Sequence, residues 1–161
     1  MIARIPMSKS GYQKLRDELC RLERVERGVV VKAIETAREH GDLKENAEYH
    51  AAKDRQGHIE GRIIELKDKL ARAEIIDCSK VSTKTVVFGT VVQLLDLDTE
   101  EEITYQLLGP EESDVKRGSI SVLSPLGRSM LGKGVGDEIQ AVTPGGTREF
   151  EVIAIHPSNF Q

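Results

Sequence analysis

Tryptophan is absent from this sequence of 161 residues, and aromatic side chains make up only 4% of it. Ligand pockets are usually lined by aromatic and other apolar side chains, so a large aromatic-lined pocket is not expected. Cysteine is also scarce. Cys20 and Cys78 lie far apart, without a CxxC pair or the histidine arrangement of a zinc site. We therefore expect two reduced thiols.

Long apolar runs are missing as well. The start of the chain lacks the apolar segment of a signal peptide, and no later segment is long enough to span a bilayer. From these features we expect a cytoplasmic protein that acts without a membrane. The histidines are not spaced as ligands on one helix face, so we expect them to be solvated. They are His40, His50, His58 and His156.

Charge is abundant but unevenly distributed. Residues 1–78 contain 16 Lys and Arg against 15 Asp and Glu, a net of +1, whereas residues 79–161 contain 7 against 12, a net of −5. Negative charge disfavours direct contact with nucleic-acid phosphates. The second half is therefore better suited to binding a basic protein surface.

Two segments with a helical repeat of apolar residues flank Gly41. In the first, which follows a plausible N-cap at Ser8, steps of three and four residues predict one buried stripe. Its members are Leu15, Leu19, Leu22, Val29, Ala33 and Ala37. The second stripe consists of Ala52, Ile59, Ile63, Leu66, Leu70 and Ala73. We expect two antiparallel helices packed along these stripes, with a weak point at Gly28 and a tip at Gly41.

Asp42 and Glu45 lie three residues apart at this tip, where no neighbouring element covers them. Two interpretations remain open. Asp42 is a good helix N-cap, and Glu45 completes a capping-box pattern with it. An exposed pair of carboxylates can also complete a Mg²⁺ site whose other ligands belong to a partner, because Mg²⁺ needs only one or two protein carboxylates. Alone, the pair should bind the metal weakly.

Several cations lie within one to three helical turns of the two acids. They are Arg38, Lys44, Lys53 and Arg55. Positive charge in this position favours attraction of a phosphate backbone towards the tip. For each of these side chains, an exposed helix charge or an i,i+4 ion pair explains the sequence equally well.

The pattern changes after residue 78. Residues 79–84 are polar and predict a short linker. Short runs rich in β-branched residues then predict strands at 86–95, 103–108, 120–123, 138–142 and 149–155. Ser124 and Pro125 are typical of a helix start, and we expect a short helix that Gly132 ends. The fold class is therefore α+β, with an antiparallel helical hairpin followed by a small, mostly antiparallel β domain.

Several motifs resemble the Gre family of bacterial transcript cleavage factors. The main match is the tip, from His40-Gly41-Asp42-Leu43-Lys44-Glu45 through Asn46-Ala47-Glu48-Tyr49-His50 to Ala51-Ala52, with Glu60-Gly61-Arg62-Ile63 after it. Further matches are Ile5-Pro6-Met7, Phe88-Gly89 with Val91, Ile120-Ser121 with Ser124-Pro125, and Thr143-Pro144-Gly145-Gly146. The resemblance covers nearly the whole chain and keeps the family's order.

The resemblance implies a coiled-coil hairpin over residues 1–78 with its acidic tip at 41–46, a linker at 79–84 and an FKBP-like domain over 85–161. In this family the second domain docks on RNA polymerase, and the coiled coil enters the polymerase's secondary channel. Asp42 and Glu45 correspond to the catalytic tip acids, which help to hold a second Mg²⁺ shared with the polymerase. Two-metal chemistry then cleaves backtracked RNA, so the polymerase is the enzyme and this factor is not.

Other roles are implied by the resemblance alone. The family's basic patch, which contacts the RNA 3′ segment, corresponds to Arg38, Lys53 and Arg55. The region associated with polymerase docking corresponds to Ser124, Pro125, Leu126 and Arg128. Gly28 departs from the family pattern, in which proline is frequent at this position. We expect the chain to act as a monomer.

Two alternatives remain. A secondary-channel inhibitor of RNA polymerase with the same fold would not stimulate cleavage, and the presence of both Asp42 and Glu45 disfavours it. A prolyl isomerase is suggested only by the implied FKBP-like domain, whose pocket is normally aromatic. Residues 79–161 contain few aromatic side chains for such a pocket. They are Phe88, Tyr105, Phe150 and the C-terminal Phe160.

Overall fold

The computed structural model describes residues 3–158, which pack into two compact units. Of the described residues, the first unit contains Tyr12–Ala73 together with residues 3–5, and the second contains Pro6–Gly11 and residues 74–158. The proposed domain limits at residues 78 and 85 stay a prediction. Within residues 3–158, every helix is too short or too polar to cross a membrane.

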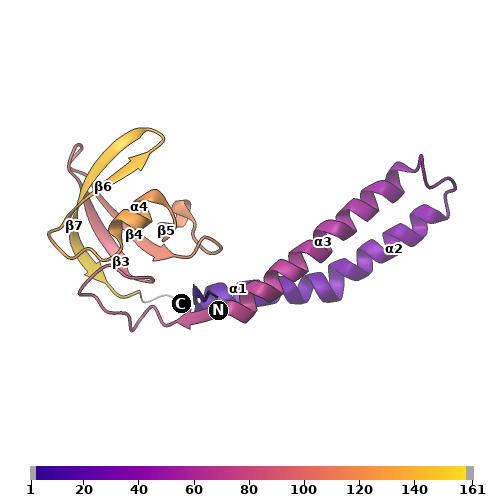
Figure 1. The fold of residues 1–161 in the computed structure, drawn as a ribbon, viewed down its shortest axis with the longest axis horizontal. Coiled ribbons are helices and arrows are strands. Elements are labelled where there is room, and N and C mark those ends of the chain that lie inside the picture. The colour runs from indigo at the N-terminus through magenta and orange to yellow at the C-terminus, as the bar shows by residue number, and fades with distance from the viewer. Residues whose placement is uncertain (1–2, 159–161) are drawn as a thin grey trace. The chain divides into compact units, whose positions relative to one another are not determined.

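The first unit is a helical hairpin (Figure 1). Its first arm contains α1 (Lys9–Arg21), a π-helical turn (Leu22–Glu26) and α2 (Arg27–Arg38), and its second arm is α3 (Ala47–Arg72). Ser8 precedes α1 and caps it, because its hydroxyl accepts a hydrogen bond from the backbone N–H of Gly11 at 3.0 Å. The predicted antiparallel pair of helices is therefore confirmed, with an irregular turn in its first arm.

The buried stripe of the first arm changes phase at the π-helical turn. Its buried residues are Leu15, Leu22, Val30, Ile34 and Ala37, and Leu19 is half-buried. The sequence pattern predicts Val29 and Ala33 in this stripe, but both are exposed, and that part of the prediction is wrong. The backbone N–H of Arg27 donates to the carbonyl of Leu22, five residues back. Because this turn holds one residue more than an α-helical turn, every later residue moves one position around the helix.

The second arm follows its predicted stripe. Ala52, Ile59, Ile63 and Leu66 are buried, and Leu70 and Ala73 are half-buried. The arms are also joined by ion pairs that lie outside the apolar seam: Arg27–Glu60 at 2.7 Å, Arg55–Glu26 at 2.7 Å, Arg62–Glu18 at 2.9 Å and Lys67–Glu23 at 3.5 Å. Partly exposed ion pairs contribute less to stability than buried apolar contacts, so the apolar seam is the main source of packing energy.

The second unit is built on a curled five-stranded sheet with the strand order β5-β4-β3-β7-β6 (Figure 1). Its strands are β3 (Val91–Asp96), β4 (Glu102–Leu108), β5 (Ser119–Ser121), β6 (Glu138–Thr143) and β7 (Gly146–His156). Only β4 and β5 pair in parallel, so the predicted mostly antiparallel domain is confirmed. The helix α4 (Pro125–Met130) contributes Met130 to a core that also contains Leu94, Leu107, Phe150 and Val152.

Two details of the strands differ from the sequence prediction. The strand expected from residue 86 begins only at Val91, because Gly89 has a φ of +88° and the N–H of Thr90 turns back to the carbonyl of Val87. A separate two-stranded sheet, β1 (Ile5–Ser8) with β2 (Ala73–Ile76), was not expected. Each of its strands has only four residues, too few to establish a clear alternation in the sequence.

Candidate functional site

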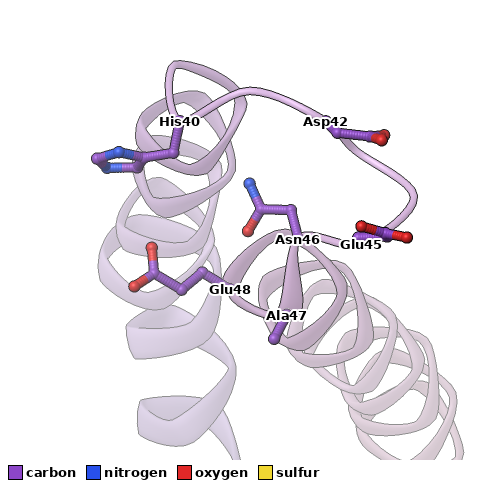
Figure 2. A pocket seen from close by; sticks show the side chains of 6 residues that line it. All are labelled: His40, Asp42, Glu45, Asn46, Ala47 and Glu48. Carbon is purple, nitrogen blue, oxygen red and sulfur yellow. The ribbon is translucent and has the colours of Figure 1, made fainter.

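The tip loop, residues 39–46, joins α2 to α3. Together with the start of α3 it surrounds an open hollow of about 520 Å³. The residues that line this hollow are His40, Asp42, Glu45, Asn46, Ala47 and Glu48 (Figure 2). Gly41 has a φ of +113°, a backbone conformation that suits glycine, and it directs the chain out of α2 towards Asp42. The predicted tip at Gly41 is therefore confirmed.

Asn46, rather than Asp42, caps α3. Its side-chain oxygen accepts a hydrogen bond from the backbone N–H of Tyr49 at 3.1 Å, and the helix begins at Ala47. The carboxylate of Asp42 instead accepts the N–H of Lys44 at 2.9 Å, within the loop. The capping-box interpretation of the two acids is therefore wrong. The sequence matches the capping-box pattern. A helix capped by Asp42 would begin at residue 43, however, and α3 begins four residues later, at Ala47.

The two acids are both exposed, and their carboxylates lie on the same side of the loop, whereas Glu48 points away on the other side (Figure 2). Carboxylate oxygens are the ligands that Mg²⁺ prefers, and one or two of them per protein are usual. Within residues 3–158 there is no group of three or more His, Cys, Asp or Glu side chains arranged to hold a metal. The tip therefore has the donor type for Mg²⁺ but only part of a ligand set.

Two side chains outside the acidic pair hold the loop. The Nδ2 of Asn46 donates to the carbonyl oxygen of Ala37 at 2.6 Å, and the Nε2 of His50 lies 3.0 Å from the carbonyl oxygen of Lys44. All four histidines are exposed, as predicted. The one sequence signal for the cap was an asparagine directly before the helical pattern of α3.

The cations near the tip have different surroundings. The guanidinium carbon of Arg38 lies 5.9 Å from the centroid of the Tyr49 ring, and the ammonium group of Lys53 lies 3.3 Å from the side-chain oxygen of Gln56. Arg55 is in an ion pair with Glu26 of the other arm, so the structure already gives its charge a partner. Lys44 is exposed on the loop itself. Of these four cations, Arg55 is therefore the one whose charge is paired with the other arm of the hairpin.

In the second unit, the residues expected to dock on a partner come together on α4. Ser124 caps this helix by accepting the N–H of Gly127 at 3.0 Å, and Pro125 is its first residue. Leu126 packs against the core, whereas Arg128 is exposed. The predicted short helix is therefore confirmed.

The aromatic side chains of this unit that the structure describes are buried or half-buried, and Phe160 lies outside the described residues. Phe150 is buried in the core, and Phe88 and Tyr105 are half-buried. Both cysteines are free, as predicted; Cys20 is exposed, whereas burial raises the pKa of the Cys78 thiol above its ordinary value. A buried thiol with a raised pKa is a poor nucleophile.

Comparison with known proteins matches nearly the whole chain. Residues 5–75 match the family model described as "Transcription elongation factor, N-terminal", and residues 81–157 match "Transcription elongation factor, GreA/GreB, C-term". The transcription elongation factor GreA of Desulfotalea psychrophila is 74% identical over 160 residues, 99% of each chain. The GreA of Caulobacter sp. strain K31 is 55% identical and aligns with 94% of this chain and 97% of its own length.

Among solved structures, the crystal structure of GreA factor homolog 1 (Gfh1) of Thermus thermophilus is 35% identical. It covers 95% of this chain and 99% of its own, with a TM-score of 0.43.

Proposed function

This chain belongs to the GreA/GreB family of transcription elongation factors, and we propose that it stimulates cleavage of backtracked RNA by bacterial RNA polymerase. In this proposal the hairpin enters the secondary channel of the polymerase and brings its tip to the active centre. The polymerase carries out the hydrolysis, and this chain, acting as a monomer, supplies groups to it. Arrested complexes are thereby returned to elongation.

The observation that carries the proposal is the exposed pair of carboxylates on one side of the tip loop, at the end of a hairpin with an apolar seam. Asp42 and Glu45 would hold a Mg²⁺ ion shared with the polymerase, whose other ligands come from the polymerase. Such an ion, when bound, lowers the pKa of a coordinated water and stabilises charge on the leaving oxygen. The N–H of Lys44 orients the Asp42 carboxylate, which reduces the freedom that the acid loses on binding.

Other residues would bind the substrate and the partner. Arg38 and Lys53 are exposed near the tip and would attract the phosphates of the RNA 3′ segment. Arg55 would join them only after exchanging its ion pair with Glu26 for a phosphate. Docking on the polymerase would use the residues at the start of α4, namely Ser124, Pro125, Leu126 and Arg128.

The proposal is tested by measuring RNA cleavage in stalled polymerase complexes with the wild-type chain and the variant Asp42→Asn. An asparagine oxygen can still accept the N–H of Lys44, so the loop contact is kept while the charge that holds a cation is lost. We expect cleavage stimulation to fall by a factor of about ten or more, since proton or metal assistance of this kind is worth at least that much. Glu45→Gln should behave in the same way.

Thermal melting and polymerase binding serve as controls, together with Glu35→Gln, which removes an exposed charge from the last turn of α2, outside the loop. The melting temperature and polymerase binding should be unchanged in Asp42→Asn, Glu45→Gln and Glu35→Gln. Full cleavage with Asp42→Asn would refute the proposed role of the acids. If the wild-type chain binds the polymerase and blocks it without stimulating cleavage, the channel-inhibitor alternative is correct.

A further inference from the structure

We propose that Asn46 is a positioning residue for the two tip acids, because it fastens the two ends of the tip loop to each other. This inference rests on the proposed function, in which Asp42 and Glu45 act at the polymerase active centre. Asn46 itself would touch neither the metal nor the RNA. Its role would be to keep the loop in one arrangement, so that both carboxylates arrive together.

The Asn46 side chain uses both halves of its amide. Its oxygen accepts from the N–H of Tyr49 in the first turn of α3, and its nitrogen donates to the carbonyl oxygen of Ala37 in the last turn of α2. An N–H group requires an acceptor and a carbonyl requires a donor, so these partners fix which way the amide is turned. In Figure 2 the amide extends from the start of α3 towards α2. One side chain therefore joins the two arms at the base of the loop.

The consequence for the acids follows from the short loop above this link. Lys44 lies between Asp42 and Glu45 in sequence, and its N–H is bound by the Asp42 carboxylate while its carbonyl oxygen lies 3.0 Å from His50. Asn46 is half-buried, whereas both acids are exposed. The loop is therefore held at its base and leaves the two carboxylates accessible. Closing the base of a loop removes open conformations from its ensemble.

Capping alone does not explain an asparagine here. Serine and aspartate cap a helix about as well as asparagine does, because all three present an oxygen to the first-turn N–H groups. Neither can also donate to Ala37 as an amide does, since serine is shorter and an ionised aspartate has no donor. Capping and fastening can therefore be separated by substitution.

The experiment compares Asn46→Ser, Asn46→Asp and Asn46→Ala in the full chain. The first two should keep the helix content of the wild type, as measured by circular dichroism, and the third should lose part of it. All three lose the donor to Ala37. The loop is examined by ¹⁵N relaxation of the backbone amides of residues 39–45, and Glu35→Gln is again the matched control.

We expect the loop order parameters to be near about 0.85 in the wild type and in the control, and to fall below about 0.6 in all three Asn46 variants. In stalled complexes, the maximal cleavage rate should fall by up to about fivefold, the factor by which loss of one hydrogen bond lowers the ratio of closed to open loop. The concentration of factor that gives half-maximal cleavage should not change, because Asn46 does not contribute to docking. Equal effects of serine and aspartate would assign the loss to the donor rather than to charge.

Ordered loop amides in Asn46→Ser would overturn the positioning role, and so would a loose loop with an unchanged maximal rate. A change confined to the half-maximal concentration would also overturn it. Failure of the proposed function is recognised separately, because Asp42→Asn would then retain full cleavage whatever the loop dynamics of the Asn46 variants.

Discussion

The phase change in the first arm makes a sharp prediction about two neighbouring valines. Val30 is 1% exposed and packs in the seam of the hairpin, whereas Val29 is 49% exposed on its outer surface. We compare Val30→Ala with Val29→Ala. The two substitutions remove the same atoms from the same helix, so their difference isolates the contribution of burial.

The expected magnitudes follow from these exposures. Removing two buried carbon groups from Val30 costs about 1.6 kcal/mol of transfer free energy, and the cavity left behind adds to this. Alanine is a better helix former than valine, which offsets the loss by about 0.5 kcal/mol of helix propensity at either position. Val30→Ala should therefore lower the free energy of unfolding by about 2 kcal/mol, whereas Val29→Ala should leave it unchanged or raise it slightly.

Urea unfolding followed by far-ultraviolet circular dichroism checks this prediction, because that signal reports mainly on the hairpin. The slope of the unfolding free energy against urea should be the same in the wild type and both variants. If Val29→Ala proved as damaging as Val30→Ala, or more so, the arm would be a continuous α-helix with the stripe that the sequence pattern predicts. The π-helical turn would then be wrong.

Two further predictions concern glycine and pH. A Cβ on Gly89 would lie 2.8 Å from the sulfur of Cys78, at a residue with φ of +88°, so Gly89→Ala should lower the free energy of unfolding by about 1–3 kcal/mol. Gly57 lies in α3, and a Cβ added there would meet no heavy atom outside the local helix backbone within 4 Å, so Gly57→Ala should raise the free energy of unfolding by about 1 kcal/mol in the same urea titration. The hydrogen bond from Arg62 lowers the pKa of Glu18 below its ordinary value of 4.5. The ion pair therefore stabilises the folded chain fully above pH 4.5. This stabilisation is lost as the pH falls through the lowered pKa of Glu18. Replacing Arg62 with methionine should flatten this part of the stability profile; an unchanged profile would show that the pair does not stabilise the hairpin.

The hairpin and its acidic tip could be predicted from sequence because apolar repeats and Gly41 mark them directly. The phase of the first arm could not, because Val29 and Val30 are both apolar, as are Ala33 and Ile34. The sequence therefore fits either stripe. Packing against α3 decides between them, and no local pattern contains that information.

The cap of α3 was missed for a similar reason. Asp42 and Asn46 are both good N-caps, and each is followed by a plausible first turn. The length of loop needed to bring the second arm back against the first determines which of them begins the helix. That length depends on the contact between Asn46 and Ala37, which joins residues on different elements.

The length of the two arms fixes how far the tip lies from the base of the hairpin. The 26 residues of α3 span about 39 Å at the usual rise of an α-helix, and the apolar seam keeps that length rigid. Adding or removing seven residues in both arms would move the acids by about 10 Å while returning the seams to nearly the same phase. In the proposed function, the number of residues in the arms would set the depth of insertion, and the loop, whose length stays the same, would set the chemistry of the tip. The two properties can change independently, so a chain of this kind can be fitted to a deeper or shallower channel without redesign of its tip.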